Sequence, residues 1–131
     1  MTGFWDQAIG RSATLVRIFT AADVAAYAAL TGDAGPDGEV PEPLIAGLFS
    51  TLLGVDLPGR GTNYLKQSME FVSPATIGEE IRARVEIISV RPEKRLVDLA
   101  TTCVVGERAV CRGQALVLAR GIPPAIPSGA A

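Results

Sequence analysis

Hydrophobic and polar residues alternate through most of the second half of the chain, as they do in β-strands with one buried face. The alternation is clearest in IRARVEI, where Ile81 begins an apolar series and Arg82 begins the intervening charged series. Strands are predicted over Tyr64–Val72, Glu80–Arg91, Lys94–Val105 and Glu107–Arg120, with hairpin turns at RPEK and around Gly106. Because they follow one another closely, we expect them to form a four-stranded antiparallel meander.

A strand and two helices are predicted before these four strands. Residues 11–19 (RSATLVRIF) are rich in β-branched and apolar types, and Thr20 with Asp23 approximates a capping box that starts a helix. Within that helix Val24, Tyr27 and Leu30 recur at helical spacing, and Gly32 is a natural end.

The run 44–55 (LIAGLFSTLLGV) predicts a second helix that is apolar nearly all round. A soluble helix of this kind is expected to be surrounded by the rest of the protein. The order of strand, two helices and antiparallel strands therefore predicts an α+β fold, in which an antiparallel β-sheet wraps around a central apolar α-helix.

Two of the predicted strands have unusual inward faces. In the first, the inward positions are expected to be Leu65, Gln67, Met69 and Phe71, so the Gln67 amide needs hydrogen-bond partners or orients a substrate or a partner chain. In the last strand, small residues at alternate positions from 109 to 119 would let a helix approach closely.

The length and composition predict one domain. A chain of 131 residues that is 48% hydrophobic can bury a core without disulfides or metals. Residues 1–120 are expected to form that domain and residues 121–131 (GIPPAIPSGAA) a flexible tail. Between the two helices, residues 32–43 (GDAGPDGEVPEP) are dense in Gly, Pro and acids, which is typical of a loop.

Charge and residue types exclude several classes of function. With 12 basic and 14 acidic residues, the chain has no basic stripe for nucleic acid. No apolar run reaches the ~20 residues of a membrane helix, and the N-terminal segment lacks the pattern of a signal peptide, so a cytoplasmic protein is expected. Cys103 and Cys111 lie in predicted strands and are expected to be reduced and buried. Because the chain has no histidine, the usual zinc sites cannot form, and no metal or cofactor is expected.

Two segments, FTAADVAAYAALTGD and LFSTLLGVDLPGRGTNYLKQSMEFVSPATIGEEIRARVEI, resemble the MaoC-like (R)-specific enoyl-CoA hydratase/dehydratase family over nearly the whole chain. The most specific part is LLGxxLPGxGTxYLxQxxxF, followed by a Gly-acid pair and a VEI-like strand. The resemblance implies the hotdog fold and an acyl thioester of coenzyme A or acyl carrier protein as substrate. It also implies a homodimer in which two sheets join edge to edge and an acyl tunnel lies at the interface.

The resemblance further implies a catalytic loop after the first helix. In the family this loop has the form acid, any residue, Asn, Pro, any residue, His, and its Asp and His hold the water that adds to the double bond. Asp33 and Pro36 match that loop, whereas Gly35 stands at the Asn position and Gly38 at the His position. The catalytic base is therefore retained without its histidine partner.

A second part of the implied site lies at the start of the central helix. There the family has a His-Gly pair whose glycine amide helps to bind the thioester carbonyl. An ungapped alignment puts Pro41 and Glu42 at that pair, a shifted one puts Ala46 and Gly47 there, and Ser50 matches a serine near the family's site. The candidates are thus Asp33 and Glu42 for catalysis, and Gly47, Ser50 and Gln67 for substrate binding.

Each catalytic candidate also has a plainer interpretation. Asp33 follows the helix end, where it can make a turn hydrogen bond within its own loop. Glu42 can poise water against a thioester, but a first-turn acid that stabilises its helix is more common. Asp37 and Glu39 are interpreted as solvated loop charges.

Three functions remain open from the sequence. The leading hypothesis is a divergent hydratase/dehydratase with Asp33 as its base. Loss of a positioned acid or base typically costs about 10²–10⁴ in rate, so its activity is expected to be weak or absent unless another carboxylate compensates. The second is an acyl-CoA thioesterase that uses Glu42 or Glu39, and the third is a non-catalytic acyl-thioester-binding or structural subunit.

Overall fold

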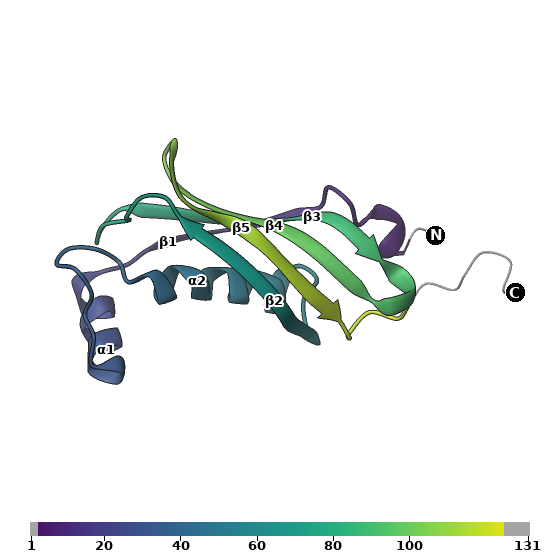
Figure 1. Cartoon of the computed structure of the whole chain (residues 1–131), viewed down its shortest axis with the longest axis horizontal. Coiled ribbons are helices and arrows are strands. Elements are labelled where there is room, and N and C mark those ends of the chain that lie inside the picture. The colour runs from purple at the N-terminus through teal and green to yellow at the C-terminus, as the bar shows by residue number, and fades with distance from the viewer. Residues whose placement is uncertain (1–2, 125–131) are drawn as a thin grey trace, which may run out of the picture.

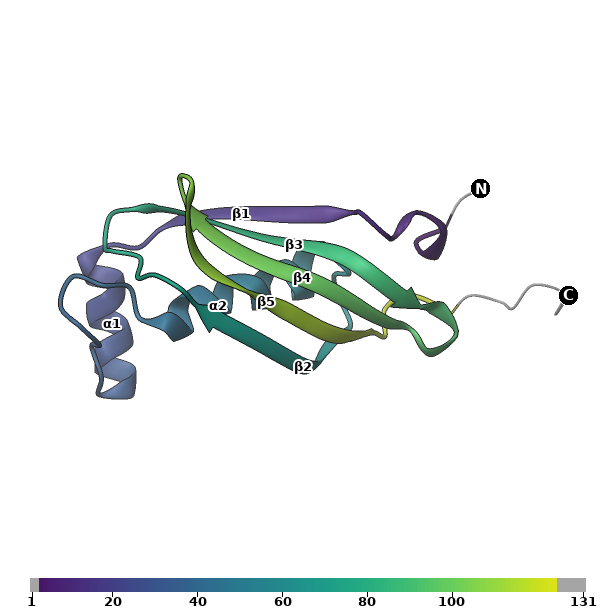
Figure 2. The ribbon, with the colours of Figure 1, turned by 45° about the horizontal axis from the view of Figure 1, so that its top comes forward.

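The computed structural model describes residues 3–124, which form one antiparallel sheet of five strands curled around a helix (Figure 1, Figure 2). The strands lie in the spatial order β1-β3-β4-β5-β2. Their bounds are β1 (Ser12–Ile18), β2 (Thr62–Phe71), β3 (Glu80–Arg91), β4 (Leu96–Val105) and β5 (Arg108–Ala119). The helices are α1 (Ala21–Thr31) and α2 (Glu42–Thr51), with a π-helical turn η2 (Leu52–Asp56) and two 3-10 turns, η1 (Trp5–Gln7) and η3 (Pro92–Lys94). The predicted α+β arrangement, an antiparallel sheet around a central apolar helix, is confirmed.

The strand β2 lies at the edge of the sheet and not beside β3. β3, β4 and β5 follow one another as expected, but β2 pairs with β5, and β3 has β1 on its other side. The connection 72–79 carries the chain back across the curled sheet (Figure 2). The predicted four-stranded meander is therefore wrong for β2, because neighbours along the chain need not be neighbours in the sheet when a longer connection joins them.

The inward faces of the strands and one side of α2 form the core. The alternation predicted in β3 is confirmed, since Ile81 and Val85 are fully buried while Arg82 is exposed. Five apolar residues of α2 and η2 are also buried in this core: Ile45, Leu48, Phe49, Leu52 and Leu53. Full burial of a large apolar side chain contributes roughly 1.5–3 kcal/mol, so these residues hold the helix against the sheet.

The other side of α2 is exposed in the single chain. The helix begins two residues before the predicted run, at Glu42, and its far side carries Gly47, Ser50 and Thr51 in contact with solvent. In η2, Val55 is 67% exposed. The sequence predicted burial all round, but the sheet covers only one side of the helix.

Two irregularities shape the edge formed by β2 and β5. The register shifts between Tyr64 and Lys66, so Tyr64 packs on the core while Leu65 is 52% exposed. The prediction that Leu65 points inward is therefore wrong, and the bulge is the reason. At Gly113 a Cβ atom would overlap the carbonyl of Ser68 on the neighbouring strand. This small residue thus permits close approach of two strands, not the approach of a helix that we expected.

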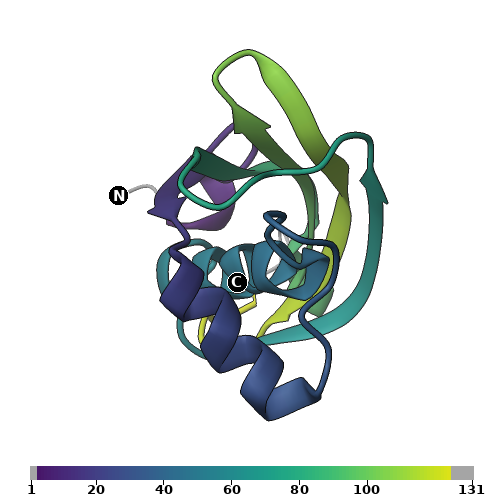
Figure 3. The same cartoon turned by 90° about the vertical axis from the view of Figure 1, so that its left-hand side faces the viewer.

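Helix α1 projects from one end of the molecule (Figure 3). The predicted capping box is confirmed: the Asp23 N–H donates to Thr20 Oγ1, and the Thr20 N–H donates to the Asp23 carboxylate. Gly32 ends the helix with a positive φ of 78°, a conformation in which glycine costs little. Among the residues of α1 only Val24 is buried. The two ends of α1 are therefore set by its own sequence, and the helix makes little contact with the core.

The two ends of the described chain lie close together. The indole Nε1 of Trp5 donates to the Pro123 carbonyl at 2.7 Å, and Ile122 packs against the core. Ile122 and Pro123 of the predicted tail thus have defined contacts, while residues 125–131 lie outside the described residues.

Candidate functional site

The loop between α1 and α2 is tied to the connection between β2 and β3. The Val40 N–H donates to the Ala75 carbonyl at 2.8 Å, and the Ile77 N–H donates to the Gly38 carbonyl at 2.9 Å. These two long-range bonds fix the end of the loop just before the start of α2.

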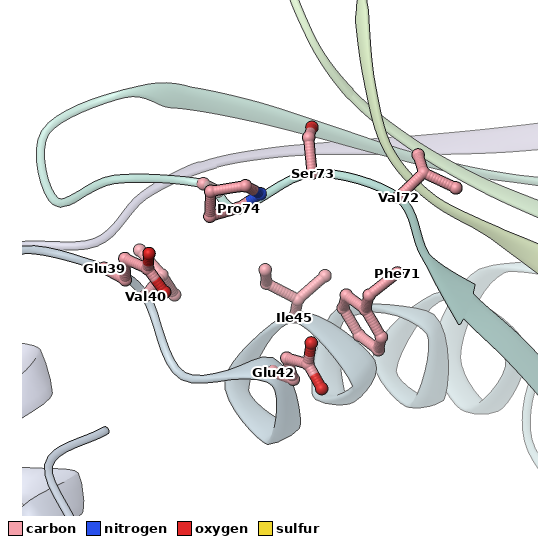
Figure 4. Close-up of a pocket in the computed structure, with 9 residues that line it drawn as sticks. Glu39, Val40, Glu42, Ile45, Phe71, Val72, Ser73 and Pro74 are labelled. Carbon is pink, nitrogen blue, oxygen red and sulfur yellow. The ribbon is translucent and has the colours of Figure 1, made fainter. Parts of the chain in front are cut away.

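Two cavities flank this fixed end. The loop cavity, of about 330 Å³, lies between α1, the loop and the start of α2. The sheet cavity, of about 310 Å³, lies between the start of α2 and the end of β2 (Figure 4). Glu39, Val40 and Glu42 line both cavities. The two cavities are thus parts of one region around the α2 N-terminus.

Asp33 lines the loop cavity. Its Oδ1 accepts a hydrogen bond from the Gly35 N–H at 2.8 Å, which is the turn bond of the plainer interpretation. No described residue donates to Oδ2, so this oxygen is open to water. Because a carboxylate has two oxygens, the turn bond can orient the group while the second oxygen does chemistry.

Glu42 is the first residue of α2 and lines both cavities. Its side chain extends from the helix start toward Phe71 of β2 (Figure 4). Burial, together with the negative charge of Glu42, raises the pKa of the Cys111 thiol to about 11. Glu42 therefore stands near the inner face of the sheet, at the positive end of the α2 dipole.

The two cysteines lie opposite each other on β4 and β5 and are buried and free. Burial, with an added contribution from the neighbouring Cys111, raises the pKa of Cys103 to about 12. Since the thiolate is the reactive form, neither residue is a nucleophile.

The three other candidates lie outside both cavities. Gly47 and Ser50 are on the exposed side of α2, and a Cβ at Gly47 would meet no atom within 4 Å. Gln67 is exposed on β2 beside Tyr64, whose phenol pKa is raised by burial and partly lowered by the Gln67 amide. The fold thus brings the two catalytic candidates to one cavity, and the substrate-binding role of the other three stays a prediction.

Tyr27 is a cavity residue that sequence reasoning did not single out. Its helical spacing placed it on the face of the first helix, yet it lines the loop cavity with Asp33 and Glu42. The missed signal is its position one helical turn before the end of α1, because a side chain there lies beside the loop that follows.

An ion pair between Arg108 and Glu79 holds the connection 72–79, to which the loop between α1 and α2 is hydrogen-bonded. Arg108 donates to Glu79 Oε1 at 2.9 Å and to the Pro74 carbonyl at 3.1 Å. The Thr76 N–H donates to the same carboxylate oxygen at 2.7 Å. The Arg108 bond and the Thr76 bond together lower the pKa of Glu79 to about 2.

Other kinds of site are not found in the part of the chain that the structure describes. Within residues 3–124, no group of three His, Cys, Asp or Glu side chains is placed to hold a metal ion. None of the described helices has the length and apolar character to cross a bilayer.

Two known proteins are similar in sequence to this chain over most of its length. The 3-hydroxybutyryl-CoA dehydratase of Methylorubrum extorquens is 34% identical over 87% of this chain and 82% of its own length. The (R)-specific enoyl-CoA hydratase of Rhodospirillum rubrum is 35% identical over 90% of this chain and 93% of its own. The chain belongs to the MaoC-like (R)-specific enoyl-CoA hydratase/dehydratase family.

Solved structures place this hydratase family member among hotdog folds. The (R)-hydratase from A. caviae, described as involved in PHA biosynthesis, superposes with a TM-score of 0.78 at 38% identity, covering 83% of this chain and 94% of that one. The R-hydratase PhaJ1 from Pseudomonas aeruginosa gives a TM-score of 0.81 at 24% identity, over 93% and 86% of the two chains, which supports the fold alone. No family model matches the chain.

Proposed function

We propose that the chain adds water to a trans-2-enoyl thioester, or removes it from the (R)-3-hydroxyacyl thioester, with Asp33 as its base. The observation that carries the proposal is the position of Asp33 in the loop cavity, with Oδ1 held by the Gly35 N–H and Oδ2 free of protein donors. The names of the relatives at 34–35% identity support the substrate class.

In the proposed hydration, Asp33 takes a proton from a water molecule in the loop cavity. The water oxygen then bonds to carbon three of the thioester, and the electrons of the double bond move toward the thioester carbonyl as an enolate. The positive end of the α2 dipole lies beside this cavity, because Glu42 at the first turn lines it. Carbon two must then receive a proton to complete the product.

The same site predicts a slow enzyme. With Gly38 at the family's histidine position, one positioned acid or base is missing, and such a loss costs about 10²–10⁴ in rate. Glu42 also lines the cavity, and its carboxylate is proposed to help to hold the attacking water.

The proposed substrate complex needs a second copy of the chain. Pockets for drug-sized ligands span roughly 300–1,000 Å³, so a cavity of about 330 Å³ accommodates the reacting end of the thioester and little more. Pairing of two sheets at an edge strand covers unpaired backbone groups. We propose that such a homodimer encloses an acyl tunnel and brings Gly47, Ser50 and Gln67 to it.

The carrier and the cell compartment are further parts of the proposal. Coenzyme A and acyl carrier protein both present the same thioester, and names of relatives include both carriers. Two free, buried cysteines suit a reducing compartment, and we propose a cytoplasmic location.

An ultraviolet assay tests the reaction. Purified protein is mixed with crotonyl-CoA and with a longer trans-2-enoyl-CoA, and loss of the enone absorbance is followed beside an Asp33→Asn variant. We expect slow loss with the wild type and none above background with the variant. A thiol reagent in parallel reports free coenzyme A, which a hydratase does not release.

The other functions give different results in this assay. Thiol release that Glu42→Gln removes indicates a thioesterase. If equilibrium binding shows that the protein binds the acyl thioester, while the enone absorbance and the free thiol stay constant, the chain is a binding subunit. Either result contradicts the proposed hydratase for these substrates.

A further inference from the structure

The loop cavity holds one phenol among three carboxylates. Asp33, Glu39 and Glu42 supply the carboxylates, and Tyr27 supplies the phenol from α1. An ionised carboxylate only accepts hydrogen bonds, whereas a phenol donates one. Since the chain has no histidine, Tyr27 is the side chain in this cavity that can donate a proton while the carboxylates stay ionised.

Thr31 links the backbone of Tyr27 to that of Asp33. Its Oγ1 lies 2.9 Å from the Tyr27 carbonyl and 3.2 Å from the Asp33 carbonyl, and it accepts from the Asp33 N–H at 3.3 Å. One hydroxyl thus fixes the last turn of α1 against the base-carrying loop. The backbone positions from which the phenol and the carboxylate extend are therefore set by local structure and not by the open part of the loop.

The Tyr27 hydroxyl is also not used elsewhere in the described structure. No described group hydrogen-bonds to it, and the side chain is only half-buried. In the neighbouring sheet cavity the hydroxyl of Ser73 already donates to the Ala109 carbonyl at 2.5 Å. Tyr27 is thus free to bond a ligand, whereas the serine is engaged.

We propose that Tyr27 is the proton donor of the hydration, an inference that rests on the proposed function. Asp33 takes a proton from water, the water oxygen bonds to carbon three, and carbon two of the resulting enolate takes the proton of the Tyr27 hydroxyl. The protonated Asp33 carboxyl then returns its proton to the phenolate through water. The net change is the addition of one water molecule, and both side chains end as they began.

Tyr27→Phe tests the donor, and Tyr64→Phe is the matched control because the chain has two tyrosines. We expect Tyr27→Phe to lower kcat for crotonyl-CoA hydration by about 10²–10⁴, the usual effect of losing a general acid, with KM within about threefold. The hydroxyl oxygen of the half-buried Tyr64 has no partner in hydrogen-bond geometry among the described residues, and Tyr64 lines neither cavity. The Tyr64→Phe variant is therefore expected to fold and to keep wild-type kcat.

A second readout separates proton donation from packing. In the Tyr64→Phe background the single tyrosine is replaced by 3-fluorotyrosine, whose phenol is the stronger acid. We expect the alkaline limb of the kcat profile to move to lower pH, because the donor loses its proton earlier. A tyrosine that only packs would leave this limb where it was.

Each outcome of the experiment decides between the claims. If the wild type turns over and the kcat of Tyr27→Phe is within threefold of the wild-type kcat, the role of Tyr27 is overturned and the hydratase function stands. An alkaline limb that does not move with 3-fluorotyrosine has the same meaning. Absence of wild-type turnover overturns the proposed function, and the role of Tyr27 fails with it. Loss of turnover in Tyr27→Phe together with the moved limb supports the inference.

Discussion

The sheet with its central helix and the segment that carries Asp33 are held in place in different ways. In β3, Ile81 and Val85 have no exposed surface. In α1, by contrast, Val24 is the only one of the helix's residues that is buried, and Leu30 is 88% exposed. The loop after α1 is fixed by a few hydrogen bonds to the connection 72–79.

This difference separates stability from chemistry. Regions with few buried apolar contacts open locally at low free energy, whereas core strands open only when the whole domain unfolds. Binding and catalytic groups are commonly placed on such loops over a rigid scaffold. We therefore expect core substitutions to change global unfolding, and substitutions in residues 20–43 to change turnover and local exchange.

The largest effect on stability is expected from Phe49→Ala. This side chain is fully buried between α2 and the sheet, and removing a buried aromatic ring costs about 3–5 kcal/mol. Urea unfolding measures the loss. Leu30→Ala, an apolar truncation on α1, is the control and should stay within about 0.5 kcal/mol. Equal losses in the two variants would show that α1 belongs to the core.

A smaller loss is expected from Gly113→Ala. The added Cβ would overlap the Ser68 carbonyl, and overpacking of this kind costs about 1–3 kcal/mol. Gly47→Ala is the contrasting change, because space around Gly47 is open and alanine favours a helix by about 0.5–1 kcal/mol. Urea midpoints should move in opposite directions; a tolerated alanine at 113 would mean that β2 and β5 can separate.

Thr20→Ala should loosen α1 alone. The lost cap of α1 costs about 0.5–2 kcal/mol, and we expect faster hydrogen exchange in the amides of α1 with unchanged exchange in β3. Faster exchange in both elements would contradict the separation of the two regions.

The smallest effect is expected from low pH on the ion pair between Arg108 and Glu79, which holds the connection 72–79. Glu79 has its pKa lowered from 4.5 to about 2, so its bonds favour the folded state above pH 4.5, and this contribution is lost as the pH falls toward 2. Glu79→Gln should flatten the dependence of the urea midpoint on pH in that window. Glu93→Gln, at an exposed turn, should keep the wild-type dependence.

Local patterns predicted the elements whose cause is local. The capping box at Thr20, the end of α1 at Gly32 and the alternation in β3 all depend on residues a few positions apart, and all three are present in the structure. The position of β2 and the outward turn of Leu65 were missed, because pairing partners and bulges are decided by strands that are distant in sequence.

The candidate site was predictable only in part for the same reason. The resemblance named Asp33 and Glu42 singly, and the hydrogen bonds between residues 38–40 and 75–77 bring them to one cavity. Tyr27 was missed because its spacing fits an apolar helix face equally well. The hydrogen bonds that assemble the cavity join residues more than 30 positions apart, and no short motif encodes them.

The most direct test of the account compares turnover and unfolding in one preparation of Asp33→Asn, with Asp37→Asn as the control in the same loop. Hydration of crotonyl-CoA is followed by chiral analysis of the product, and urea unfolding is measured on the same samples. We predict that the wild type and Asp37→Asn form the (R)-3-hydroxy thioester, and that Asp33→Asn forms none while keeping the wild-type urea midpoint. Equal product from Asp33→Asn, or no product from the wild type, would contradict the assignment of the chemistry to this loop.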